Sequence, residues 1–287
     1  MLSAAAIGGN QAFLSKPLVT VRPSTITYFA GLVSLASFFV AVVISGQIYF
    51  LLQIPLNALV VLVAFGVVQF GIVRLLMYNA IKNIGANLAS VITPTEVVFA
   101  TIFAVVFLSE RLNAGMALGT VLVVVGAMLL NPGLGATKRK GSKKLGVLFA
   151  ISAALSFGAA TVLVKAGVTL FPHFVPAVFV ACVSGVLFNA FILSPREFAS
   201  SVRKIPRSAL IFILISTACT ISTQFFKFAA LTYSTVVIFV PLMGTYPVFV
   251  LIMTRLFAGD TEVFDRRTLL SMPLVIIGAL LVGLYSA

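Results

Sequence analysis

The sequence predicts an all-α membrane protein with ten transmembrane helices, arranged as two five-helix repeats. The composition is the first observation behind this fold class: 61% of the 287 residues are hydrophobic, 9% are charged, and the mean hydropathy is +1.20. Soluble globular chains carry about 25% charged residues, so this chain lacks the polar surface that a soluble fold needs. A succession of long apolar segments and an internal duplication are the other two observations.

The duplication relates residues 151–287 to residues 2–130 at an offset of about 150. For example, Leu-Ser-Ala-Ala at residues 2–5 returns as Ile-Ser-Ala-Ala at residues 151–154. Repeats of this kind are found in membrane proteins that are built from two like bundles. We therefore expect a first repeat at 1–131, a basic, Gly-rich linker at 132–144 and a second repeat at 145–287.

The apolar segments of the first repeat predict five spanning helices. Most of them reach the roughly 20 residues that cross the hydrocarbon core, and inside lipid a helix satisfies its own backbone hydrogen bonds. The first is short for a span, and its longer copy suggests that a few residues precede Met1. The expected spans are residues 2–18, 25–46, 57–81, 87–108 and 113–131.

The second repeat gives five further spans in the same order. Because five is an odd number, the second repeat would enter the membrane in the opposite sense to the first. An inverted repeat suggests alternating access around a site near the pseudo-two-fold axis. The expected spans are residues 145–167, 174–193, 207–231, 235–257 and 268–285.

The net charge of +13 is distributed very unevenly between the two sides of this ten-helix arrangement. Only Arg111 and Lys165 fall on one side, so the positive-inside rule makes the other side cytoplasmic and places both termini outside. Basic residues at helix ends favour anionic lipid head groups as partners and exclude a nucleic-acid-binding face. The fifteen residues of the basic side are Lys16, Arg22, Lys82, Lys138, Arg139, Lys140, Lys143, Lys144, Arg196, Arg203, Lys204, Arg207, Arg255, Arg266 and Arg267.

The residue inventory argues against an enzyme and predicts no cofactor and no metal site. His173 is the only histidine, and the sequence has neither a metal-ligand cluster nor paired buried carboxylates. A phosphate-binding loop of the GxxxxGK[ST] type is absent, which argues against direct use of ATP. Cys182 and Cys219 lie in apolar stretches and indicate no disulfide framework.

Glu96 is the acidic residue that falls near the middle of a predicted span, two residues after Pro94. An ionisable group costs at least about 2.5–3.5 kcal/mol at the centre of a membrane helix, so it must face protein or a water-filled cavity. Glu96 would bind a substrate amine or carry a coupling proton. The alternative is a neutral, hydrogen-bonded acid, or a salt bridge that only holds helices together.

The repeat places further polar residues at related depths. A shift of 150 carries Glu96 to Tyr246 and Arg74 to Gln224, so four polar side chains would meet on the third, fourth, eighth and ninth spans. Arg74 would pair with Glu96 or hold a carboxylate or phosphate with its bidentate guanidinium. The alternative for Arg74 is a snorkelling side chain near the helix end.

The eighth span carries Thr217, Thr220, Gln224 and Lys227 on one helical face. Such a stripe lines either a cavity or an interhelical hydrogen-bonded seam, and Lys227 favours the cavity. In the third span, Phe70, Arg74 and Tyr78 share a face by the same spacing.

The first span offers Asn10 and Gln11 as further candidates for lining a cavity. Lys16 and its counterpart Lys165 lie near helix ends, where snorkelling is the favoured interpretation. Gly115 and Gly119 predict close helix packing in the fifth span, and the alternative is a homodimer contact.

Several motifs resemble the EamA family of the drug/metabolite transporter superfamily. They are the proline in Ala89-Ser90-Val91-Ile92-Thr93-Pro94, the turn Phe107-Leu108-Ser109-Glu110-Arg111-Leu112, the glycines Gly119 and Gly126 and, in the second repeat, Ala229-Ala230-Leu231-Thr232-Tyr233, Phe257-Ala258-Gly259-Asp260 and Gly278-Ala279-Leu280. The turn departs from the family pattern, since Ser109-Glu110 and Gly259-Asp260 stand where Gly-Glu is expected.

The resemblance implies a ten-helix permease for small metabolites, with a central cavity between the third, fourth, eighth and ninth helices. It also implies that both termini face the cytoplasm, against the charge distribution. We expect a secondary transporter in the plasma membrane for amino acids or related compounds, with proton coupling through Glu96. The alternative is an antiporter for nucleotide sugars or sugar phosphates, which several inward-facing cations would favour.

Overall fold

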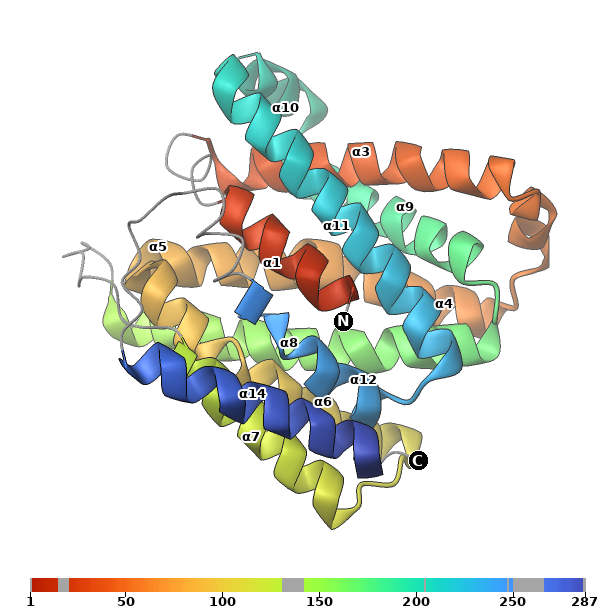
Figure 1. Cartoon of the computed structure of the whole chain (residues 1–287). Coiled ribbons are helices and arrows are strands. Elements are labelled where there is room, and N and C mark those ends of the chain that lie inside the picture. Colours follow the sequence, from red (N-terminus) through yellow and green to blue (C-terminus); the bar gives the residue numbers. More distant parts are fainter. Residues whose placement is uncertain are drawn as a thin grey trace.

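The computed structural model of the chain describes residues 2–14, 21–130, 142–203, 205–246, 248–249 and 266–285, and these form helices and their connections (Figure 1). This confirms the all-α prediction. The helices of the first half are α1 (Leu2–Leu14), α3 (Pro23–Ile44), the 3-10 helix η1 (Gln47–Gln53), α4 (Leu56–Gly66), the π-helical η2 (Val67–Ile72), α5 (Val73–Ile92), α6 (Thr95–Leu108) and α7 (Ala114–Leu130). Those of the second half are α8 (Lys143–Leu170), α9 (Phe174–Ile192), α10 (Pro195–Val202), α11 (Arg207–Tyr233), α12 (Val236–Met243) and α14 (Arg266–Tyr285).

Five helical stretches within the described residues are long and apolar enough to cross a membrane. Three shorter apolar helices accompany them, at Thr95–Leu108, Ala114–Leu129 and Ser271–Tyr285. Large apolar side chains stand out from the bundle, and Phe191 on α9 is 92% exposed. Such a surface suits hydrocarbon and not water. The long stretches are Ser24–Ile44, Leu56–Met77, Lys143–Leu170, Phe174–Ile192 and Ala209–Tyr233.

The main difference from the predicted spans lies between the third and the fourth. A connection was expected at 82–86, but α5 continues to Ile92 and the helix breaks at Thr93–Pro94. Proline has no N–H to donate, so Pro94 cannot continue the hydrogen-bond pattern of α5, whereas residues 82–86 contain no proline. The short helices η1 and α10 were not predicted either. Of the expected span 235–257, α12 covers the first part, while residue 247 and residues 250–257 lie outside the described structure.

The π-helical segment η2 joins α4 to α5 and is fastened to α9. The side chain of Asn189 donates to the carbonyl of Phe70 at 3.1 Å, and also to the carbonyl of Gly185 in its own helix at 2.7 Å. A π segment shifts the usual hydrogen-bond pattern, so an external donor is well placed to satisfy a displaced carbonyl. Gly66 lets the two helices come close, since a Cβ on it would lie 2.0 Å from Ser184 Oγ.

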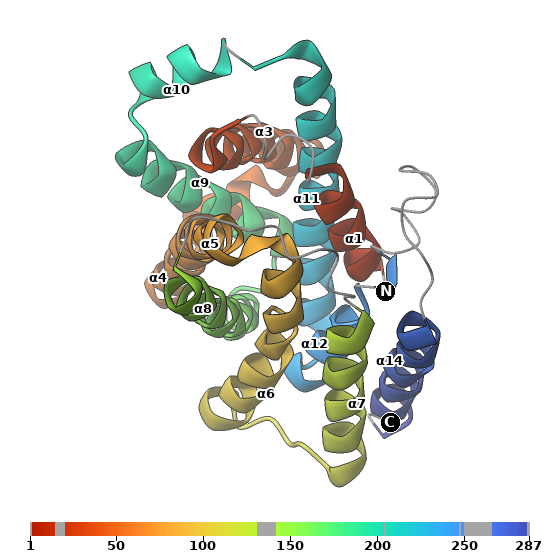
Figure 2. The ribbon, with the colours of Figure 1, turned by 90° about the vertical axis from the view of Figure 1, so that its left-hand side faces the viewer.

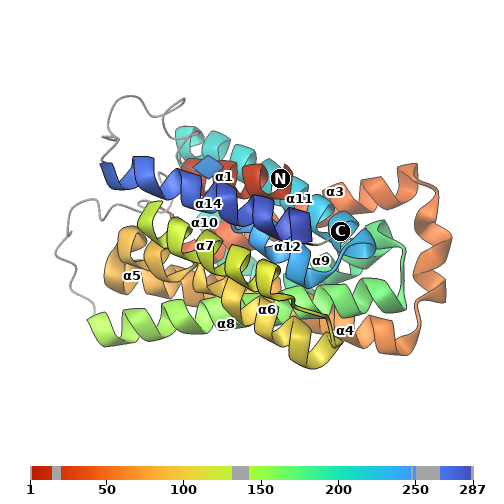
Figure 3. The same ribbon diagram turned by 60° about the horizontal axis from the view of Figure 1, so that its bottom comes forward.

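Contacts between the halves are reciprocal. Helix α1 packs against α11, and its counterpart α8 packs against α4 and α5, which correspond to α11 at the offset of the repeat. In the same way α3 packs against α11, and α9 packs against α4. Helices α3 and α9 are counterparts that pack against each other, and so are α7 and α14, which lie side by side in Figures 2 and 3.

The pair of α7 and α14 uses the glycines that the sequence singled out. A Cβ on Gly119 would lie 2.6 Å from the carbonyl oxygen of Gly278, and a Cβ on Gly115 would lie 2.4 Å from the Tyr285 ring. The small residues therefore permit close packing within one chain, as predicted. A homodimer remains a prediction.

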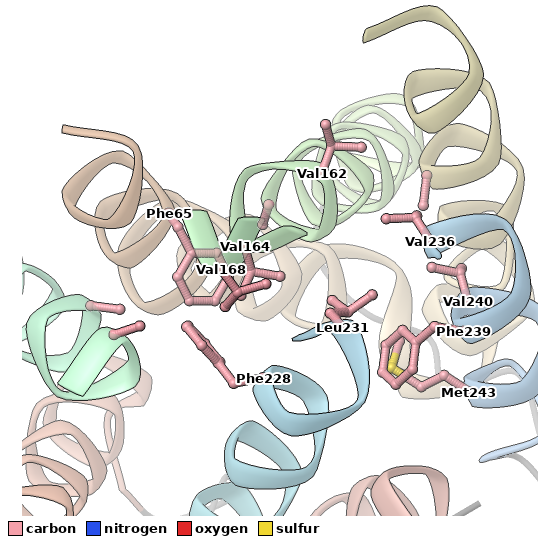
Figure 4. Close-up of a cluster of buried hydrophobic side chains, with 14 of the residues drawn as sticks. Phe65, Val162, Val164, Val168, Phe228, Leu231, Val236, Phe239, Val240 and Met243 are labelled. Atoms are coloured by element: carbon pink, nitrogen blue, oxygen red, sulfur yellow. The ribbon is translucent and has the colours of Figure 1, made fainter. Parts of the chain in front are cut away.

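The apolar core lies where α4, α8, α11 and α12 meet. Figure 4 shows Phe65 and Phe228 beside Val164 and Val168, with Leu231 leading on toward α12. The rings of Phe65 and Phe228 meet edge to face, with centroids 5.2 Å apart. This core borders the polar groups described next, because Phe65 also contacts Lys227.

Candidate functional site

Glu96 lies in the first turn of α6, directly after the Thr93–Pro94 break. Its side chain is 4% exposed, and its backbone N–H donates to the carbonyl of Thr93 at 2.9 Å. A carboxylate is favoured at a helix N-terminus because the first N–H groups and the helix dipole are positive there. Among the described residues, no side chain or backbone group donates a hydrogen bond to the Glu96 carboxyl group. Within the described part of the chain, the carboxyl group is therefore buried without a direct hydrogen-bond donor.

Lys227 on α11 is a buried basic residue in the same region as Glu96, and its side chain is 1% exposed. Its ammonium donates to Thr161 Oγ1 on α8 at 3.1 Å, and lies 4.6 Å from the ring centroid of Phe157 and 5.6 Å from that of Phe65. Aromatic faces attract a cation, so the two rings partly replace the water that Lys227 loses. Thr161 in turn donates to the Phe157 carbonyl at 3.1 Å, which leaves its oxygen free to accept from Lys227.

Glu96 and Lys227 lie buried at the junction of α6, α8 and α11, close enough for a charge on one to act on the other. No hydrogen bond joins them in the described structure, so they attract one another without direct contact. A buried charge without a partner is strongly unfavourable in a membrane protein. The burial of Glu96 and the burial of Lys227 therefore depend on each other. We call Glu96, Lys227, Thr161, Phe157 and Phe65 the central site.

The polar stripe on α11 divides into two parts. Near its start, Asn10 of α1 donates to the Ser216 carbonyl at 2.9 Å, to Ser216 Oγ at 3.0 Å and to Thr220 Oγ1 at 2.6 Å, which makes an interhelical seam. Thr217 is buried and donates to Ile213 of its own helix at 2.7 Å. Toward the end, Gln224 is buried and its side-chain oxygen accepts no hydrogen bond within the described structure. The seam and the central site therefore share one helix face.

Arg74 lies on α5 and is half-buried. Its guanidinium carbon is 5.9 Å from the centroid of the Phe70 ring, and its charge acts on Cys182 of α9. The structure shows no ion pair between Arg74 and Glu96 in the described part of the chain. Arg74 thus lies beside the contact between η2 and α9, and the π segment buries a second polar group, Gln69.

Tyr246 is 4% exposed and follows the Gly244–Thr245 break, as Glu96 follows Thr93–Pro94. The two helix breaks therefore fall at positions related by the repeat. The side chains of Tyr78 and Gln11 lie outside the described structure, although their backbones belong to α5 and α1. Lys16 lies in a segment that the structure does not describe.

Lys165 does not snorkel to the surface. Its ammonium donates to the carbonyls of Leu231 at 2.9 Å and Ser234 at 2.8 Å, at the end of α11. On the other side of the same junction, Glu110 accepts from the N–H groups of Val236 at 2.9 Å and Val237 at 2.8 Å, at the start of α12. Opposite charges therefore hold the connection between α11 and α12 from both sides.

Sequence reasoning missed Thr161, Phe157 and Phe65. Phe157, Thr161 and Lys165 follow one another at intervals of four residues in α8, so they share a helix face. This spacing, together with the recurrence of Lys16 as Lys165 in the second repeat, was the signal that could have identified Thr161 and Phe157.

This arrangement of apolar helices around a buried, charged site defines an integral membrane protein of the multi-pass class. The family model of the EamA-like transporter family matches residues 1–131 and again residues 144–284. The chain therefore belongs to the EamA-like transporter family, and the resemblance noted in the sequence is confirmed. It is accordingly a transporter of the drug/metabolite transporter superfamily.

Solved structures agree with this fold. A crystal structure described only as that of a protein is 14% identical in sequence and superposes with a TM-score of 0.74 over 99% of this chain and 97% of that chain. At that identity the likeness establishes the fold alone. No curated protein matches the chain.

Proposed function

We propose that the chain is a secondary transporter for small zwitterionic metabolites such as amino acids, and that the central site binds them. One observation carries this proposal: an acidic and a basic side chain, Glu96 and Lys227, lie buried in the same region and make no direct hydrogen bond with each other in the described structure. A zwitterion carries both complementary charges. Its amine would meet Glu96 and its carboxylate would meet Lys227, so that both buried charges gain a partner on binding.

The rings beside Lys227 support a substrate with an apolar part. Phe157 and Phe65 border the ammonium, and the ring of Phe228 packs edge to face with that of Phe65. Apolar walls with a few placed polar groups are usual for small-molecule sites.

The transport cycle is proposed to be alternating access between two inverted halves of five spans each. The reciprocal contacts of α1 with α11 and of α8 with α4 and α5 support a two-fold relation between the halves. The helix breaks at Thr93–Pro94 and Gly244–Thr245 would provide the bending points near the site. A proton carried by Glu96 would couple the cycle, because a carboxyl group that exchanges one partner for another can release and rebind a proton.

The test is substrate-induced thermal stabilisation of the purified protein in detergent. The panel contains amino acids, the corresponding amines and amides, and sugar phosphates. A ligand that binds the folded state raises the unfolding temperature by mass action. We expect zwitterionic amino acids to stabilise the native protein, and the amine and amide analogues, which lack the carboxylate, to stabilise it less.

Three variants test which residues bind the ligand. Glu96→Gln and Lys227→Met should each lose the ligand-induced shift, measured against their own ligand-free baselines. Glu197→Gln is the matched control, since Glu197 is an exposed acid in the N-terminal cap of α10. A ligand that stabilises native protein and Glu96→Gln equally would remove Glu96 from the binding site. Stabilisation by sugar phosphates alone would favour the second candidate function, an antiporter of sugar phosphates or nucleotide sugars, for which Lys227 and Arg74 would be the anion-binding groups.

A further inference from the structure

The connection between α11 and α12 is an extended joint. Ser234 has φ −132° and ψ 164°, and Thr235 has φ −83° and ψ 159°. The helix that follows spans only eight residues, contains Pro241, and ends where the chain turns at Gly244–Thr245. Proline removes one of its few internal hydrogen bonds. Helix α12 is therefore a short helix with few internal hydrogen bonds, and the chain changes direction at both of its ends.

Glu110 supplies hydrogen-bond acceptors for the first N–H groups of α12. The first N–H groups of a helix have no partner within the helix, and here the carboxylate accepts from two of them, Val236 and Val237. Hydrogen bonds to a charged group are about twice as strong as neutral ones. Glu110 belongs to the turn between α6 and α7, so these two bonds join the first half of the chain to the second.

The backbone conformation of Ser109 sets the position of the Glu110 carboxylate. It has φ 54°, and the left-handed conformation ends α6 and turns the chain toward α12. Glu110 is only half-buried, so water can reach the carboxylate and replace the two amides when they separate.

Lys165 behaves differently although it holds the same joint. It lies on α8 and bonds to the end of α11, so both partners belong to the second half. The Lys165 bonds tie the end of α11 to α8 and involve no residue of the turn between α6 and α7, so loss of the Glu110 bonds would leave them in place.

We propose that Glu110 is a positioning residue that latches α12 to the first half, and that this latch opens when the transporter changes conformation. The inference rests on the proposed movement of one half against the other, but it requires no particular substrate. Lys165 holds the other side of the joint, where α11 ends, to α8.

The test is a distance measurement by double electron–electron resonance in reconstituted protein without substrate. Spin labels are attached to Arg111→Cys and Tyr233→Cys, which are both exposed and lie on the two sides of the latch, in a Cys182→Ala/Cys219→Ala background. Labels on Leu170→Cys and Tyr233→Cys form the matched control pair, since the Lys165 bonds that join α8 to the end of α11 do not involve Glu110.

Replacing Glu110 by Ala should shift the Arg111–Tyr233 distribution toward longer distances and leave the Leu170–Tyr233 distribution unchanged. Glu110→Gln, which keeps an acceptor oxygen without the charge, should give a smaller shift. Unchanged distributions in Glu110→Ala for both pairs would overturn the latch. Broadening of both pairs would also overturn it, because Glu110 would then be a general support of the fold. A wrong substrate class would not affect either result, so the two proposals fail independently.

Discussion

At the scale of single residues, the central site depends on a balance of two buried charges. Removing one member leaves the other without compensation, and breaking a buried pair costs about 3–5 kcal/mol of folding stability. We predict that Glu96→Gln and Lys227→Met each destabilise the protein by that order, and that the double variant loses less than the sum of the two. The losses are measured as free energies of unfolding in mixed micelles for the native protein, the two single variants and the double variant. Additive losses would show that the two charges do not interact.

Ser109 offers a second residue-scale prediction. The left-handed conformation costs a residue with a Cβ roughly 1 kcal/mol relative to glycine, and Ser109 adopts it at φ 54°. Ser109→Gly should therefore raise the free energy of unfolding by about that amount. Ser45 is the control, since it also follows a helix but has φ −74° and donates to the Val42 carbonyl. A gain in Ser45→Gly equal to that in Ser109→Gly would contradict the explanation.

The sequence anticipated some residues better than others. Glu96 and Lys227 were found because charge in an apolar helix is visible without a structure. Thr161 was missed because a threonine in such a helix is common and usually bonds to its own backbone, as Thr217 does. Lys165 was expected to reach toward solvent, and its actual partners, the carbonyls of Leu231 and Ser234, are backbone groups that no residue pattern reveals.

At the scale of elements, the helices of most predicted spans were found near their expected bounds because apolar length alone determines them. The division of the third and fourth spans was wrong because Asn83 and Gly85 do not end α5, whereas Pro94, which has no N–H to donate, does break the chain. The π segment η2 could not be predicted, since its sequence is as apolar as the helices on either side. Its stabilising partner, Asn189, is 119 residues away from Phe70.

The contact between α4 and α9 gives a prediction at this scale. A Cβ on Gly66 would lie 2.0 Å from Ser184 Oγ and 2.2 Å from the Ala181 carbonyl oxygen, and a carbonyl cannot rotate aside. Gly66→Ala should destabilise the protein by about 1–3 kcal/mol, the usual cost of overpacking. Gly283→Ala is the control, because a Cβ there meets nothing within 4 Å. The unfolding temperatures of both variants in one detergent provide the measurement. Equal effects would refute the steric account.

At the scale of the whole molecule, charge predicts orientation. Exposed cations lie at the starts of α3, α8 and α11 and along α10, for example Arg203, whereas Arg111 lies at the opposite ends of the helices. The positive-inside rule then places Arg203 in the cytoplasm and Arg111 outside. The family resemblance implies the reverse arrangement, with the termini inside.

Thiol labelling decides between the two orientations. In a Cys182→Ala/Cys219→Ala background, Arg111→Cys should react with a membrane-impermeant maleimide in intact cells, and Arg203→Cys should react only after permeabilisation. Reaction of Arg203→Cys alone in intact cells would favour the orientation that the resemblance implies.

The two pairs of counterpart helices, α3 with α9 and α7 with α14, have a consequence for how such a chain arose. A contact between equivalent elements is the kind that a symmetric homodimer makes, since the same surface then meets its own copy. Before the duplication, two copies of a half-length ancestor would have met through the α3 face and the small-residue face of α7, among the other contacts that now join the halves. In such a dimer, the contact that Gly119 now makes with Gly278 would have joined the same helix of two separate polypeptides.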